Sequence, residues 1–549
     1  MKKKISAVLL SVMLAAVSLF SVGCGPVESV DGEGTKYGKR DRAFTFCYYA
    51  GGYGTDWLDA VLDDYMLNVN TDVYINLKRN TNNDTTRTNI KTGVGTYDLY
   101  QIEVDMFGCS NCLADMSELY ETEVYGEPGV KVKDKFGDRW VDYYEENGHW
   151  YQMPQTQLTG WNWAYNKDLL DSTLGAGQYS LPRTTEEFFA FGDELYKKGV
   201  YLTAFPGADT AGGDYSRYAY ELWFAQMTGL EGYQKYMSGY YKDEQTGEWT
   251  FAEDAPVQSK QNETAITEAY KVAQRLCTPA ASAADSQYMH AQSMGMTFKD
   301  VDVMLYGGRY RGQKVPPIAF SYVGGWLETE VAPFVNAGTI SGDQKVMAMK
   351  MPVISAITSR TPTINDEQTL LKVIDYVDGV AESAPQGVTE GDIAVVREAR
   401  NMVSELICRQ FVVTNSAQNK DDIFDFLAYL TSERAQKIAA KATRGISVLP
   451  YGYTPTDEDM GFTISDYTKS VEAIKRESVI VDEGGLDMPY RSFFGMSWFV
   501  DSAAAGGTLS QNLFTKQAED YKTIATSTYK KLNSTYKDVM AQYKIKYGL

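Results

Sequence analysis

The residue types that could do chemistry in this chain are mostly aromatic and acidic. There are 40 Tyr, 9 Trp and 72 Asp plus Glu residues, but only two histidines, His149 and His290. Nucleophilic catalysis by Ser–His or Cys–His pairs and His-based metal sites are therefore not expected. Tyr and Trp combine apolar faces with polar edges, so their excess favours contact with a sugar or a peptide, although most of them are expected to fill cores.

Cysteines and carboxylates leave two other chemistries open. Cys109 and Cys112 have the spacing of a redox pair or of half a zinc site, but no second pair and no histidine lie near them. A local disulfide is expected there, with free thiols as the alternative. A pair of carboxylates could hydrolyse a glycosidic bond, yet nothing in the spacing of the acids selects such a pair. We therefore expect no enzyme activity, no metal and no cofactor.

Aromatic side chains near the ends of strands are the best candidates for sugar contact. A pyranose packs its C–H patches on an aromatic face, while its hydroxyls require carboxylates, amides or Arg. Tyr53 follows a strand directly, where ligands bind in α/β sheets. Trp161 and Trp163 lie on one face of a strand because side chains alternate. Both could stack on a ligand, or both could pack in a core.

The elements that position these residues alternate along the chain. Residues 43–50 read as a strand, residues 56–68 as a helix and residues 72–77 as a second strand. This order predicts a parallel sheet. Residues 97–102 form a further expected strand.

Helices are also expected further along the chain. Thr184 and Glu187 have capping-box spacing and predict a helix start. Residues 420–442 and 509–531 are expected to form amphipathic helices.

The N-terminus is typical of a bacterial lipoprotein signal. Residues 2–4 are lysines, residues 5–20 are apolar, and Ser21-Val22-Gly23-Cys24 resembles a lipobox. Residues 1–23 are then removed and Cys24 carries the lipid, which holds the protein on the extracytoplasmic face of the cell membrane. Residues 24–41 are expected to be a flexible tether. A plain signal peptide or an N-terminal membrane helix is the alternative.

Length and charge restrict the architecture and the partners. A chain of 549 residues is too long for one core, so two or more lobes are expected. The formal net charge of −20 disfavours nucleic acid and anionic lipid as partners. No later stretch is long and apolar enough to cross a bilayer.

Several widely spaced segments resemble a known family. They are Gly51–Trp57, Gly160–Asp168, Gly324–Glu328, and Asn419–Gln436 followed by Arg444–Val448. Together with the signal they resemble the family 1 extracellular solute-binding proteins, the lipoproteins that capture ligand, usually a sugar or oligosaccharide, for an ABC importer. The resemblance spans nearly the whole chain, although the chain is long for the family.

The resemblance implies an α/β fold of the two-lobed periplasmic-binding-protein type (class II). Each lobe would be a mainly parallel sheet flanked by helices, and hinge segments would join the lobes. The implied segments are 42–164 for the start of the first lobe, 165–404 for the second lobe, 405–455 for the return to the first lobe, and 456–549 for C-terminal helices packing mainly on the second lobe. Residues 356–404 are expected to form additional helices, and the resemblance implies no role for them.

The resemblance also implies ligand-facing positions. Trp326 is the strongest stacking candidate, because the preceding glycines allow a turn that projects it toward the cleft. The full set of expected ligand-binding residues is Tyr53, Glu103, Asp105, Trp161, Trp163, Tyr220, Trp223, Trp326, Glu328, Arg444 and Trp498.

The function implied is that of a monomeric binding lipoprotein whose partners are an oligosaccharide and the permease subunits of an ABC transporter. The same scaffold with another solute, such as a peptide or polyol, is the first alternative. A surface glycosidase is the second.

Overall fold

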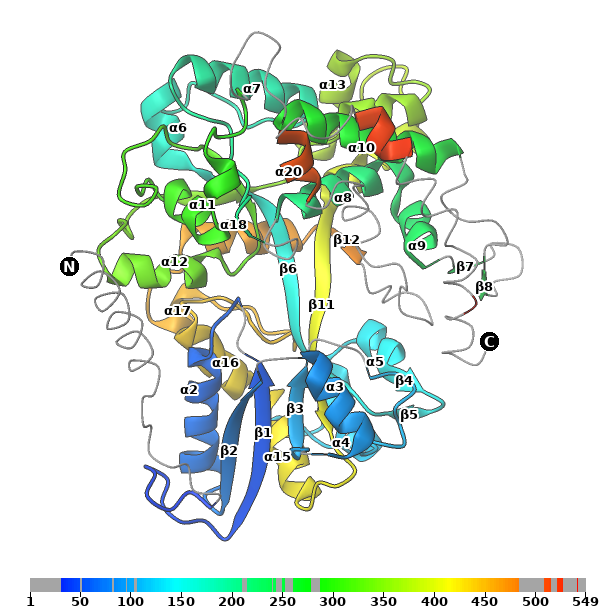
Figure 1. Ribbon diagram of the computed structural model, residues 1–549. Helices are drawn as coiled ribbons and strands as arrows, with labels where there is room; N and C mark the ends of the chain where they lie inside the picture. Colours follow the sequence, from blue (N-terminus) through cyan, green and yellow to red (C-terminus); the bar gives the residue numbers. More distant parts are fainter. Residues whose placement is uncertain are drawn as a thin grey trace, which may run out of the picture.

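The computed structural model describes residues 31–49, 52–80, 83–94, 96–102, 106–209, 215–238, 240–242, 249–251, 260–277, 287–482, 508–514, 521–526 and 541. These residues form two lobes joined by long strands (Figure 1). Four residues with expected roles, Cys24, Glu103, Asp105 and Trp498, lie outside the described residues.

The first lobe, lower in Figure 1, is built on a parallel sheet, as the strand order predicts. Strand β1 (Arg42–Tyr49) pairs in parallel with β2 (Val73–Asn80) and with β3 (Leu99–Ile102). Helix α2 (Asp56–Asp64) covers the sheet with the apolar side expected from its spacing, and the chain continues as a π-helix (Tyr65–Val69). The remaining helices of this lobe are α3 (Asn83–Thr92), α4 (Ser117–Glu121), α5 (Asp138–Tyr144), α15 (Lys420–Leu430), α16 (Glu433–Ala442) and α17 (Asp457–Met460). A short hairpin, β4 (Glu145–Glu146) and β5 (His149–Trp150), completes it.

Two long antiparallel strands connect the lobes. Strand β6 (Met153–Asn166) leads up into the second lobe and β11 (Met402–Val413) leads back (Figure 1). In the second lobe β6 pairs antiparallel with β9 (Phe320–Val323) and β10 (Val346–Met349), while β11 pairs in parallel with β12 (Val479–Asp482). One eight-stranded sheet therefore runs through both lobes. Its second-lobe part is mixed rather than mainly parallel.

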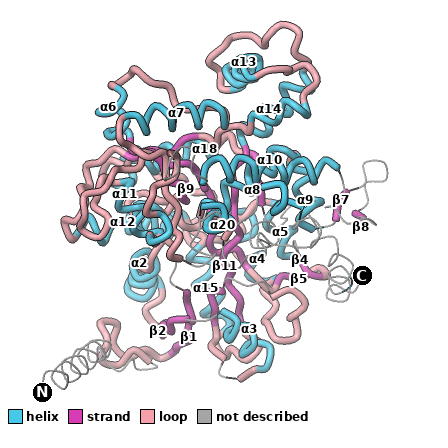
Figure 2. The backbone as a smooth tube through the Cα atoms, turned by 45° about the horizontal axis from the view of Figure 1, so that its top comes forward, coloured by secondary structure: helices cyan, strands magenta, loops and turns pink. Residues whose placement is uncertain are grey.

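Helices surround the sheet in the second lobe. Helices α8, α10 and α20 pack together on one side (Figure 2). Helix α7 begins where the sequence predicts, because the hydroxyl of its N-cap Thr184 accepts the N–H of Glu187. The helices here are α6 (Lys167–Leu174), α7 (Thr185–Lys197), α8 (Ser216–Thr228), α9 (Leu230–Ser238), α10 (Lys260–Cys277), α11 (Phe298–Leu305), α12 (Leu327–Asn336), α13 (Glu367–Val377), α14 (Glu390–Asn401), α18 (Asp466–Lys475) and α20 (Leu509–Phe514). Strands β7 (Tyr240–Lys242) and β8 (Trp249–Phe251) form a separate hairpin.

Three details differ from expectation. The segment 31–41, expected as part of the tether, folds against α2, where Lys36 and Tyr37 both contact the carboxylate of Asp63. The expected helix 420–442 is two helices, because the Ser432 hydroxyl accepts an N–H and starts a new helix after a break. Cys109 and Cys112 carry free thiols rather than a disulfide.

Within the described ranges, no helix is both long and apolar enough to cross a membrane.

Candidate functional site

A cluster of aromatic rings lies where the two lobes meet. We name it the junction cluster, and it comprises Tyr53, Trp161, Tyr215, Tyr218 and Trp326. Tyr53 comes from the β1–α2 loop of the first lobe and meets Trp326, the N-cap of α12 in the second lobe, at a centroid distance of 6.0 Å. Trp161, on the connecting strand β6, lies 4.6 Å from Trp326 and stacks on Tyr218 at 4.0 Å. Both lobes and the strand that joins them therefore contribute to one aromatic cluster, whose rings are buried against one another.

Two glycines make room for the Trp326 indole. A Cβ on Gly52, in the first lobe, would lie 2.9 Å from Cγ of Trp326, and a Cβ on Gly324, in the second, would lie 2.1 Å from Cζ3. Real Cβ atoms do not approach other atoms so closely. One glycine from each lobe therefore lets the backbone approach the indole closely, Gly52 at its five-membered ring and Gly324 at its six-membered ring, and the glycine of the expected turn has a direct packing role.

One buried polar atom of the junction cluster lacks a partner. The Nε1 atom of Trp161 is buried and makes no hydrogen bond within the described residues, whereas the buried Trp326 Nε1 faces the Glu330 carboxylate and the Tyr215 hydroxyl. An unpaired buried N–H costs about 1–3 kcal/mol, so a hydroxyl-bearing ligand or water that accepted the Trp161 proton would be stabilised. The cluster thus offers both apolar faces and a hydrogen-bond donor.

A pair of carboxylates that sequence reasoning missed lies behind the cluster. Glu330 on α12 accepts a hydrogen bond from the Tyr215 hydroxyl at 3.2 Å, and Asp302 on α11 lies within hydrogen-bonding reach of Glu330. Burial raises the pKa of Glu330 to about 7, and burial together with the Glu330 charge raises the pKa of Asp302 well above its usual value. The spacing of four between Trp326 and Glu330 is a helical signal that could have indicated Glu330. No signal indicated Asp302.

The other acidic and basic candidates lie apart from the rings. Glu328 accepts hydrogen bonds from Ser465 at 2.7 Å and Thr468 at 3.0 Å, which joins α12 to α18. Burial raises its pKa, and the positive charge of Arg444 opposes that rise. Arg444 is exposed and has a positive φ of 60°.

The remaining aromatic candidates pack within the second lobe. Trp163 lies 4.9 Å from Phe188 and 5.4 Å from Tyr322, in the main core. Tyr322 also stacks on Trp161, as expected for two tryptophans on one strand face. Trp223 donates to the carbonyl of Pro352 at 3.0 Å, and its side chain is fully buried.

Tyr220 is likewise fully buried, and its hydroxyl pairs with the Ser510 hydroxyl at 3.0 Å. Trp163, Tyr220 and Trp223 therefore lie outside the junction cluster.

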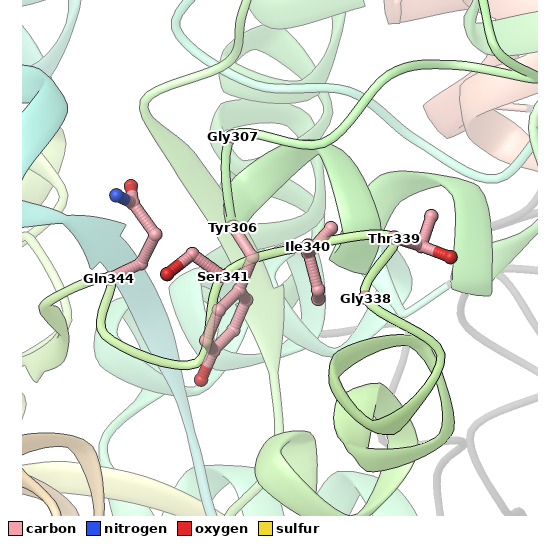
Figure 3. A pocket seen from close by; sticks show the side chains of 7 residues that line it. All are labelled: Tyr306, Gly307, Gly338, Thr339, Ile340, Ser341 and Gln344. Atoms are coloured by element: carbon pink, nitrogen blue, oxygen red, sulfur yellow. The ribbon is translucent and has the colours of Figure 1, made fainter.

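A separate surface pocket lies beyond the ends of α11 and α12 (Figure 3). Its volume is about 390 Å³. Its lining comprises Tyr306, Gly307, Gly338, Thr339, Ile340, Ser341 and Gln344, and includes none of the expected site residues. In the described part of the chain, no group of three or more His, Cys, Asp or Glu residues could hold a metal ion.

No family model and no curated protein matches this chain. Solved structures do match. An ABC substrate-binding protein from Listeria monocytogenes, in complex with cycloalternan, is 14% identical with a TM-score of 0.52, over 90% of this chain and 99% of that chain. The acarbose-binding receptor of Streptomyces glaucescens is 15% identical with a TM-score of 0.52, over 91% and 98%. A chitin oligosaccharide binding protein is 12% identical with a TM-score of 0.55, over 90% and 98%. The chain therefore has the two-lobed fold of the extracellular solute-binding proteins, as the sequence resemblance predicted.

Proposed function

We propose that this protein captures a neutral oligosaccharide between its two lobes, with the junction cluster as the stacking surface. The observation that carries the proposal is the contact of Tyr53, from one lobe, with Trp326, from the other, beside the buried Trp161 Nε1 atom, which has no hydrogen-bond partner among the described residues. A sugar supplies the matching chemistry, because its C–H faces stack on rings and its hydroxyls accept indole protons. The similar structures that bind acarbose, cycloalternan or chitin oligosaccharides support this class of ligand.

The proposal includes a lipid anchor on Cys24 and delivery of the sugar to an ABC permease. The lipobox-like sequence supports the anchor. One similar structure is a probable secreted solute-binding lipoprotein from Streptomyces coelicolor. In this account the protein binds and releases its ligand without changing it, and works as a monomer on the outer face of the membrane.

A glycosidase is the less favoured alternative. Such enzymes need two carboxylates about 5 to 9.5 Å apart, with space for the scissile bond between them. Asp302 and Glu330 instead interact directly with each other as a buried pair behind the rings. A sugar that is recovered shortened after incubation would favour this alternative.

A thermal-shift screen tests the proposal. The panel contains α-glucan, chitin and xylan oligosaccharides, with dipeptides, polyols and anionic sugars for comparison. A ligand that binds only the folded state at about 100 times its Kd adds about 2.7 kcal/mol of stability and raises the Tm. We expect a neutral oligosaccharide to give the largest rise. A rise with a dipeptide or polyol alone would contradict the sugar proposal while keeping the scaffold's binding role.

A further inference from the structure

We propose that Glu330, backed by Asp302, is the positioning residue of the junction cluster, and that a proton shared by these two acids couples the packing of Tyr215 and Trp326 to pH. The inference deepens the proposed function, since it concerns the same site. Its test uses the protein without ligand, so the two can fail independently.

Glu330 lies next to the rings of the junction cluster. Glu330 follows Trp326 by one helical turn, so both side chains lie on one side of α12. Its carboxylate accepts the Tyr215 hydroxyl proton at 3.2 Å. The Tyr215 ring in turn lies 5.0 Å from Trp161 and 6.2 Å from Trp326. One carboxylate therefore fixes a ring that contacts both tryptophans.

The two acids lie in contact with each other. The Oδ2 atom of Asp302 and the Oε2 atom of Glu330 are both buried and accept no proton from the described residues. Two buried carboxylates in contact cannot both be ionised without a large electrostatic cost. A single proton between them removes this cost and gives each oxygen a hydrogen bond. The pair then titrates as a unit.

Several other groups face the pair of acids. Lys299, also on α11, is a cation whose charge favours ionised Glu330, as do the Tyr215 hydroxyl and the Trp326 indole. The hydroxyls of Tyr306 and Tyr467 face Asp302 more distantly. The effect of these groups on the pKa values of the two acids is smaller than the effect of burial, which raises both. As the pH rises through about 7, Glu330 therefore ionises first while Asp302 keeps its proton and donates it to Glu330, and the carboxylate so formed fixes the Tyr215 hydroxyl and the Trp326 indole.

The test follows near-ultraviolet circular dichroism, which reports the packing of Tyr and Trp, between pH 5 and pH 9. We expect wild type to show a transition centred near pH 7, and Glu330→Gln to remove it because an amide cannot ionise. Glu328→Gln is the matched control, since Glu328 is a partly buried acid on the same helix that bonds Ser465 and Thr468 instead. It should keep the transition.

A milder variant keeps the test decisive if Glu330→Gln fails to fold. Tyr215→Phe retains the ring and both acids but removes the hydroxyl that stabilises ionised Glu330. Its transition should move to higher pH. A flat wild-type profile, a transition that persists in Glu330→Gln, or an unchanged midpoint in Tyr215→Phe would each overturn the proposal.

Discussion

Replacement of Gly52 by Ala should weaken ligand capture by holding the lobes apart. The added Cβ would lie 2.9 Å from Cγ, 3.0 Å from Cδ1 and 3.2 Å from Cδ2 of Trp326. The indole has little room to retreat, because it is buried and its six-membered ring already packs closely against Gly324. The steric overlap between the added methyl group and Trp326 must therefore be relieved by separation of the two lobes.

The size of the effect follows from the cost of overpacking. Inserting one methyl into a filled contact costs about 1–3 kcal/mol. If this cost falls on the closed state alone, the ratio of closed to open molecules falls about 5- to 150-fold, and the apparent affinity falls with it. The backbone does not add to the cost, because Gly52 is not among the residues with positive φ.

The assay compares Gly52→Ala with Gly391→Ala in ligand titrations and in small-angle scattering. Gly391, on α14, has open space where a Cβ would lie, so the same substitution there should change neither affinity nor radius of gyration. Gly52→Ala should bind more weakly and show a larger radius at equal ligand concentration. Equal affinity and radius for both variants would refute the view that the lobes close through Trp326.

Three further outcomes follow from the sequence and the packing. Cys24→Ser should release the protein from membranes without unfolding it, and its retention there, measured by fractionation, would indicate a membrane helix. Trp326→Ala should weaken sugar binding by about 1–3 kcal/mol, whereas Trp150→Ala, which removes a ring stacked on Tyr120 far from the cluster, should not; equal losses of affinity in both would contradict the assignment. Arg400→Leu should destabilise the fold by about 3 kcal/mol at pH 7, because it removes the guanidinium that contacts the Asp378 carboxylate at 2.9 Å and leaves Lys350, at 3.2 Å, as its remaining cation.

The Arg400 variant also has a pH signature. Burial alone would raise the pKa of Asp378, but the guanidinium of Arg400 and then Lys350 bring it below its usual value. This lowered pKa contributes stability above the unfolded pKa, and that contribution is lost as the pH falls through the folded value. The free energy of unfolding, measured with urea, should therefore fall more steeply with decreasing pH for wild type than for Arg400→Leu. Parallel profiles would show that the pair does not control acid stability.

Local features of the fold were predictable because local physics determines them. The β-rich composition of 43–50 and the helical spacing of 56–68 indicated β1 and α2, and Thr184 marked the start of α7. The break at Ser432 was missed because the apolar spacing continues across it, although the serine is a common N-cap. The packing of Tyr37 on Asp63 was missed because composition alone suggested a tether.

The site was only partly predictable because its members meet through tertiary packing. Tyr53 and Trp326 follow turns at element ends, so position along the chain favoured them. Trp161 could not be separated from Trp163 by alternation; both are buried in the main core, and only the packing brings Trp161 to Trp326 and Trp163 to Phe188. Asp302 and Glu330 are brought together by the contact of α11 with α12, which no local pattern specifies.

The central claim, capture of an intact oligosaccharide by closure of two lobes, is tested most directly by small-angle scattering with and without the best sugar from the thermal-shift panel. A ligand that touches both lobes gains its full contacts only in the closed state, so the population must shift toward that state. We predict a smaller radius of gyration in the presence of saturating sugar, with the sugar recovered uncleaved by chromatography. An unchanged radius with tight binding would place the ligand in one lobe alone, and a shortened sugar would identify an enzyme.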